Sequence, residues 1–195
     1  DAVVVDALIA PNAPMPKPPS PAAGIAEILF DIGGILASDQ RNQRADLALI
    51  FYQLAASLKP DQDFAWLMIA GLYEQFQQTP KAVAALNKIG PNSPLYWQAR
   101  LRTAALDAQE DKLDQAISRL RALVAEKPAR WDAALTLADL LRTKERYADA
   151  VAAYDTVISR LRNPEERHWQ IYFGRGIALE RTKQWPKAEA DMKKA

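Results

Sequence analysis

From Ala22 to the end of the chain, apolar side chains recur three and four residues apart, as in Ala150, Tyr154, Val157 and Ile158. This spacing is typical of an amphipathic helix that buries one face. Short polar stretches interrupt the pattern and separate the apolar runs. The pattern therefore predicts helices in pairs: 22–38 with 43–58, 62–77 with 80–89, 95–109 with 113–126, 130–143 with 147–161, and 166–182 with 186–195.

The predicted pairs recur at a fixed 34-residue step. Four alanines keep this step, and so do three prolines: Ala48, Ala82, Ala116, Ala150, Pro60, Pro94 and Pro128. A large apolar residue follows each of the alanines by four positions. A fixed period of this length is the mark of an array in which one supersecondary unit repeats. The interval from Ala150 to Ala188 is four positions longer, which predicts a loop insertion near 162–167.

These units resemble the tetratricopeptide repeat, a 34-residue helix–turn–helix with a loose pattern of aromatic, small and apolar positions. The best copy contains Trp66, Ile69, Ala70, Tyr73, Ala82, Leu86, Ile89 and Pro94. The resemblance covers about 22–195 and implies an all-α, right-handed solenoid of about five units. The expected divisions are 22–60 (degenerate), 61–94, 95–128, 129–164 and 165–195 (truncated).

Residues 1–21 differ in composition from the rest. Residues 1–10 are mostly apolar, and residues 11–21 contain six prolines. Proline lacks the backbone N–H and fixes its own φ angle, so an extended segment or linker is expected over 1–21. Residues 1–10 are either a tail or a segment that packs on an apolar surface of this chain or of a second copy.

Composition narrows the class of protein. Apolar residues make up 49% and charged residues 25%, with a formal net charge of +1, so no basic face indicates nucleic-acid binding. No run of 18 apolar residues is present, so membrane insertion is not expected. Cysteine is absent, which excludes disulfides and is compatible with cytoplasm or periplasm. A similarity to long bacterial tetratricopeptide proteins, which usually begin with an export signal, favours the cell envelope over the cytoplasm. The first residue is Asp rather than Met, and the last residues continue a helical pattern, so trimmed termini are expected.

Residues for catalysis are scarce. The single histidine, His168, has no partners for a zinc site or a Ser–His–Asp arrangement and is expected on a surface loop. The glycine pairs Gly33–Gly34 and Gly174–Gly176 lack the Lys–Ser/Thr of a phosphate loop, so they are expected to relieve close helix contacts. Neither catalytic residues, nor a metal site, nor a cofactor is expected, and the chain is predicted not to be an enzyme.

The resemblance implies that the first helix of each unit lines a concave groove. The expected peptide-groove residues are Phe64, Leu67, Gln75, Gln98, Leu101, Gln109, Leu135, Asp139, Arg142, Phe173 and Arg181. The same repeat positions also contain Gly71, Glu74, Ala105, Ala108, Asp132, Thr143, Gln170, Ile177 and Glu180. The apolar members either anchor a peptide or pack adjacent helices. Trp97, Trp131 and Trp169 share one repeat position, where they either pack helix starts or offer stacking surfaces.

The expected function is a non-enzymatic scaffold that binds a protein or peptide through this groove. Two alternatives remain at this point. The units could form a structural module that assembles with copies of itself as a homo-oligomer, including by exchange of the N-terminal segment. They could also be an accessory domain of a larger enzyme.

Overall fold

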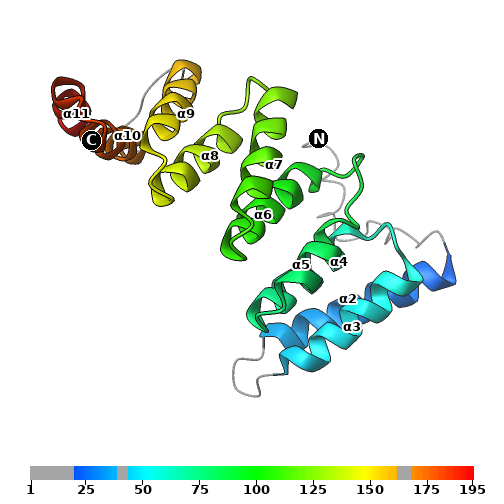
Figure 1. Ribbon diagram of the computed structural model, residues 1–195. Coiled ribbons are helices and arrows are strands. Elements are labelled where there is room, and N and C mark those ends of the chain that lie inside the picture. Colours follow the sequence, from blue (N-terminus) through cyan, green and yellow to red (C-terminus); the bar gives the residue numbers. More distant parts are fainter. Residues whose placement is uncertain (1–19, 39–43, 162–167) are drawn as a thin grey trace. The chain divides into compact units, whose positions relative to one another are not determined.

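The computed structural model describes residues 20–38, 44–161 and 168–195, and every regular element in these ranges is a helix (Figure 1). The helices are α2 (Pro21–Ser38), α3 (Ala45–Leu58), α4 (Asp63–Gln75), α5 (Thr79–Leu86), α6 (Tyr96–Gln109), α7 (Leu113–Glu126), α8 (Asp132–Thr143), α9 (Tyr147–Arg160), α10 (Trp169–Arg181) and α11 (Trp185–Met192). This arrangement confirms the all-α fold. The predictions for residues 1–19 and for the insertion at 162–167 lie outside the described residues.

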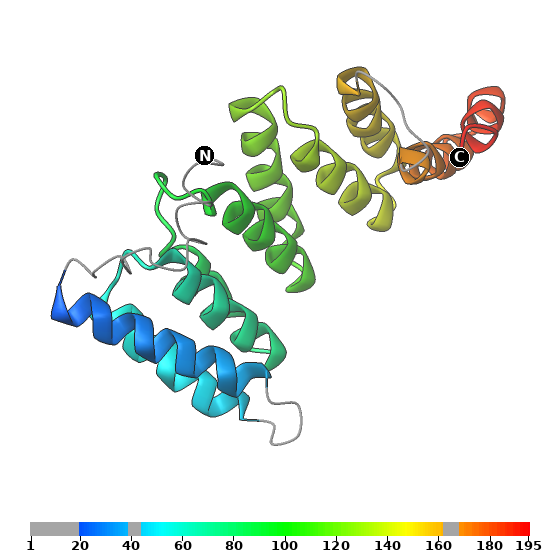
Figure 2. The ribbon, with the colours of Figure 1, turned by 180° about the vertical axis from the view of Figure 1, so that it is seen from behind.

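The chain divides into two compact units, one ending at Ser93 and one beginning at Pro94. The described part of the first contains α2–α5, and the second contains α6–α11. Figures 1 and 2 show α2 and α3 side by side along their lengths. The division falls next to the unit boundary that the repeat pattern places at 94/95.

The turns inside the helix pairs share one backbone geometry. Gln77, Asp111, Glu145 and Lys183 have φ angles between 56° and 62°, the left-handed region. In each turn the next backbone N–H reaches back five residues to a carbonyl, as from Arg146 to Leu141 (2.8 Å). This is the Schellman ending of a helix, which satisfies carbonyls that the helix itself leaves unpaired. The polar turns predicted from the sequence are therefore specific chain reversals.

The small residues of the repeat let helices approach closely. The alanines on the 34-residue step and the first-helix alanines are fully buried: Ala48, Ala70, Ala82, Ala104, Ala116, Ala138 and Ala150. The large residues that follow the second-helix alanines, Tyr52, Leu86, Leu120 and Tyr154, are also buried. The repeat pattern of the sequence is thus the interior packing of the helices.

Two glycines face tyrosine rings. A methyl group added at Gly33 would lie 2.8 Å from two ring carbons of Tyr52, and one at Gly174 would lie 2.7 Å from Cζ of Tyr154. Real methyl groups do not approach other atoms so closely. Glycine at these positions therefore relieves close contacts between helices, as predicted from the sequence.

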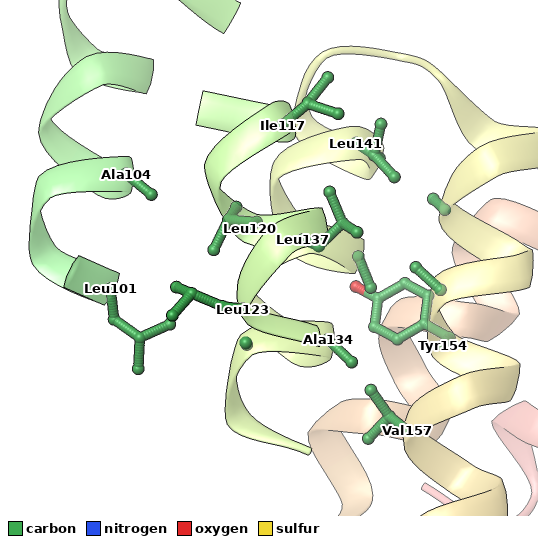
Figure 3. Close-up of a cluster of buried hydrophobic side chains, with 14 of the residues drawn as sticks. Leu101, Ala104, Ile117, Leu120, Leu123, Ala134, Leu137, Leu141, Tyr154 and Val157 are labelled. Carbon is green, nitrogen blue, oxygen red and sulfur yellow. The ribbon is translucent and has the colours of Figure 1, made fainter. Parts of the chain in front are cut away.

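The second unit has a continuous core (Figure 3). Leu120 and Tyr154, both fully buried, lie among Leu101, Leu123, Leu137, Leu141 and Val157. Helix α8 contacts both α6 and α10, so the first helices of successive repeats are neighbours. The exposed sides of α6, α8 and α10 are here called the first-helix face.

Helix α2 bears on the expectation about membrane insertion. Its 18 residues have a mean hydropathy of 1.4, so by length and composition it is the one described helix that could cross a membrane. The sequence prediction of no membrane insertion rested on the lack of an unbroken apolar run. The charged residues Glu27 and Asp31 do interrupt the apolar sequence of this helix. Within the chain, only 17% of this span is buried.

Candidate functional site

The second unit contains a hollow of about 560 Å³ between α6 and α8, here called the α6–α8 hollow. Its lining residues are Ala104, Ala105, Ala108, Gln109, Leu120, Thr136, Asp139, Leu140, Thr143 and Lys144. The apolar members come from three helices, α6, α7 and α8. The polar members contribute amide, hydroxyl, carboxylate and ammonium groups to the lining.

Small side chains create this hollow. Helix α6 places Ala105 and Ala108 toward α8, and a methyl group is all that each contributes to the lining. Ala105 is exposed and Ala108 is half-buried. Beneath them, the fully buried Leu120 of α7 closes the bottom. The result is an apolar depression that the chain itself leaves open.

Asp139 is the one carboxylate among the described lining residues, and its side chain is half-exposed. The Tyr154 hydroxyl donates a hydrogen bond of 2.5 Å to Asp139 Oδ1. Arg142 Nε donates to the same hydroxyl oxygen at 3.1 Å, and Arg142 Nη2 lies 3.9 Å from Asp139 Oδ1. Burial, and then the hydrogen bond to Asp139, raise the pKa of Tyr154 well above its ordinary value. Tyr154 is therefore a neutral donor at physiological pH and fixes the orientation of the Asp139 carboxylate.

Lys144, a lining residue of the hollow, forms an ion pair with Asp111. Lys144 Nζ donates to Asp111 Oδ1 at 2.9 Å and joins the turn after α8 to the turn after α6. The hydrogen bond and the charge of Lys144 hold the pKa of Asp111 below its ordinary value. Because Asp111 is fully exposed, this pair positions Lys144 rather than adding much to stability.

The residues expected in the groove have different surroundings. Gln109 and Asp139, with Ala105, Ala108 and Thr143, line the hollow, and Arg142 lies beside it. Leu101 is 9% exposed and belongs to the core, and Leu135 is half-buried against that core. The other expected residues are Gln98 (exposed, α6), Phe173 and Arg181 (exposed, α10) and, in the first unit, Phe64 (exposed), Leu67 (half-buried) and Gln75 (exposed), all on α4.

Sequence reasoning missed part of the lining. Leu120 lies on a second helix, and Lys144 lies in a turn, whereas the expected positions were all taken from first helices. Leu140 is on α8 at a repeat position that the resemblance does not assign to the groove. A signal for Lys144 was present, because the turns recur with the 34-residue step and so place Lys144 near Asp111.

The tryptophans at the shared repeat position have different exposures. Trp97 is buried, and its Nε1 donates to Asp132 Oδ2 at 2.9 Å. Trp131 is half-buried and meets the ring of His168 edge-on, with centroids 5.9 Å apart. Trp169 is 45% exposed, with its ring centroid 6.0 Å from that of Phe173.

His168 corrects an expectation. It is only 8% exposed, so it is not a surface loop residue. Its ring packs against Trp131 at the start of α10, and nothing in the sequence indicated this contact because the two residues are 37 positions apart. Within the described ranges, no group of three or more His, Cys, Asp or Glu residues could hold a metal ion.

Comparison with known proteins agrees with this geometry. Residues 101–163 and 135–195 match the family model described as tetratricopeptide repeat. Residues 101–195 therefore match the tetratricopeptide repeat. The matched residues lie in the second unit and include every residue that lines the α6–α8 hollow.

Solved structures with the same fold cover most of the chain. The crystal structure of MamA protein is 20% identical, covers 87% of this chain and 89% of its own, and has a TM-score of 0.67. A tetratricopeptide repeat protein from Parabacteroides merdae is 22% identical, covers 91% and 66%, and has a TM-score of 0.64. YrrB, a TPR protein with an unusual peptide-binding site, is 15% identical, covers 87% and 84%, and has a TM-score of 0.60. No curated protein matches the sequence.

Proposed function

We propose that this chain is a non-enzymatic scaffold and that the α6–α8 hollow receives a segment of a partner protein or peptide. The observation that carries the proposal is the hollow itself: an open apolar depression on the first-helix face, surrounded by oriented polar groups. Binding sites for small or extended ligands typically combine an apolar lining with a few positioned polar groups. The peptide-binding site named for YrrB supports the same class of ligand for a protein of this fold.

The lining favours a particular kind of peptide. The methyl groups of Ala105 and Ala108 and the side chains of Leu120 and Leu140 suit a large apolar side chain. Gln109, Thr136 and Thr143 can exchange hydrogen bonds with a peptide backbone. Nucleic acid is disfavoured, because the one lysine among the described lining residues is paired with Asp111, and the carboxylate there would repel phosphate.

The test is peptide selection followed by measurement of affinity. A displayed random-peptide library is selected on the full chain, and the dissociation constants of the enriched peptides are measured by fluorescence polarisation. Ala105→Trp should weaken binding at least about tenfold, or ~1.4 kcal/mol, because the indole occupies the hollow. The exposed position of Ala105 allows this change without disturbing the core.

Ala122→Trp is the matched control, because Ala122 is an exposed helical alanine that does not line the hollow. It should leave the affinity unchanged. Equal affinities for the wild type and Ala105→Trp, with circular dichroism showing both folded, would reject the hollow as the binding site. Failure of the library to yield any peptide that binds the free chain would argue against a peptide ligand.

A further inference from the structure

Helix α2 is apolar on two sides. Ala23, Ala26 and Gly33 are buried, and Gly33 faces the ring of Tyr52 on α3. Ile25, Ile28 and Ile35 are 51%, 61% and 69% exposed. At ~100° per residue these isoleucines lie roughly 150° around the helix from the buried residues. The exposed side is therefore nearly opposite the side that packs on the chain itself.

The exposed isoleucines have a regular spacing. Together with the half-buried Ile32 they form a row along the helix, here called the isoleucine seam: Ile25, Ile28, Ile32 and Ile35. Steps of three, four and three residues are those of the a and d positions of a coiled coil, where side chains of one helix insert between those of another. Such a seam is complementary to a helix with the same spacing, and α2 of a second copy has that spacing.

We infer that the isoleucine seam is a contact surface for a second copy of this chain, with α2 packed against α2 across a two-fold axis. In a symmetric pair of this kind the same patch is used on both copies. In a parallel pair each isoleucine of the seam lies beside the same isoleucine of the second copy. Asp31 then flanks the seam opposite Leu36 of the second copy, so no two carboxylates oppose each other.

The charges on α2 favour a protein occupant over a lipid surface. Its only charged residues are Glu27 and Asp31, and no basic residue lies on the helix. Helices that lie on membranes usually carry lysine and arginine, which anionic headgroups attract. Two carboxylates near the middle of the helix also oppose insertion across a bilayer.

The size of the contact sets the expected strength. An 18-residue helix is about 27 Å long, and one helix pair of this length falls near the lower limit of specific interfaces, roughly 1,000 Å². The pair should therefore form reversibly and depend on concentration. Sedimentation of the full chain from about 1 to 200 µM should show the mass rising from 21.7 kDa toward twice that value, as expected for a weak interface.

Substitutions identify the surface. Ile28→Glu combined with Ile35→Glu should keep the chain monomeric at every concentration while circular dichroism shows unchanged helix content. Trp185→Glu is the matched control, because Trp185 is 59% exposed on α11 and should leave the association unchanged.

Cross-linking gives an independent readout, since the natural sequence contains no cysteine. Ile28→Cys combined with Ile32→Cys should form disulfide-linked dimers under mild oxidation, and Trp185→Cys should not. A wild-type chain that stays monomeric at about 200 µM, the highest concentration of the sedimentation series, would overturn the inference. Association that persists in the Ile28→Glu, Ile35→Glu variant, or that Trp185→Glu abolishes, would also overturn it.

Discussion

At the scale of single residues, two kinds of contact recur in the second unit. An aromatic ring packs against a glycine, and carboxylates accept hydrogen bonds from neighbouring side chains. Tyr154 combines both, because its ring fills the core against Gly174 and its hydroxyl orients Asp139 beside the hollow. The sequence predicted that the glycines relieve close contacts. It could not predict which ring each glycine faces, because that depends on how neighbouring repeats stack.

Gly174→Ala should destabilise the chain even though alanine favours helices. The new methyl group would lie 2.7 Å from Cζ of Tyr154, so the ring or the helix must shift, at a cost of about 1–3 kcal/mol. Urea unfolding measures this loss. Gly34→Ala is the control, because its new methyl group would lie 3.8 Å from the nearest neighbour, the Tyr52 hydroxyl, and it should stabilise by up to about 1 kcal/mol. Similar effects of the two substitutions would contradict this packing.

Asp132 should make stability depend on acid pH. Burial raises the pKa of Asp132, but hydrogen bonds from Arg130, Trp97 and the Ala133 backbone N–H outweigh it and hold the pKa below its ordinary value. A lowered pKa in the folded state contributes stability above the unfolded value, about 3.9, and this contribution disappears as pH falls through the folded value. Asp132→Asn should therefore cost about 1–2 kcal/mol at pH 7 and less near pH 3. A difference between variant and wild type that stays constant over this range would argue against this origin of the stability.

At the scale of helices, the sequence predicted where the helices lie along the chain, but not the geometry of the turns or the burial of each side chain. The apolar spacing placed all of the described helices to within a few residues, because the spacing is itself the buried face. The left-handed turn residues could not be recognised, since none of them is glycine. Similarly, Leu101 fits a groove position by its repeat register, yet its side chain is buried in the core.

Glu145→Gly should stabilise the chain by about 1 kcal/mol. Glu145 has a φ of 60°, a conformation that glycine adopts without the steric cost that other residues incur. Thermal unfolding reports the change as a higher Tm. Glu110→Gly is the control, since Glu110 ends α6 with a φ of −81° and gains nothing from glycine. Equal shifts of Tm for the two variants would show that the turn geometry is not the cause.

At the scale of the whole chain, the 34-residue period predicts an array of repeats over 22–195, and the structure divides the chain into two compact units at Ser93/Pro94. The 34-residue spacing shows that a helix pair recurs, but it carries no information on how tightly one helix pair packs on the next. Lys144 and Leu120, which complete the lining of the hollow, were not predicted, because the expected groove residues were all taken from first helices. The family match also falls on the second unit, from residue 101 onward.

The two units should respond separately to a core substitution. Leu120 is fully buried in the core of the second unit, so Leu120→Ala should cost about 2–5 kcal/mol there. Amide hydrogen exchange should accelerate in α6–α11 and stay near the wild-type rate in α3–α5. Equal acceleration in both units would mean that they unfold as one.

The most direct test of the proposed binding role is to map a selected peptide onto the full chain by amide chemical shifts in solution. Binding in the hollow predicts that the largest changes on saturation fall on α6 and α8, at Ala105, Ala108, Gln109, Asp139 and Thr143, with little change in α2 or α11. Ala105→Trp should abolish these changes at the same peptide concentration. Chemical-shift changes centred on any other surface, with the residues of the α6–α8 hollow unaffected, would contradict the proposal that the hollow binds the peptide.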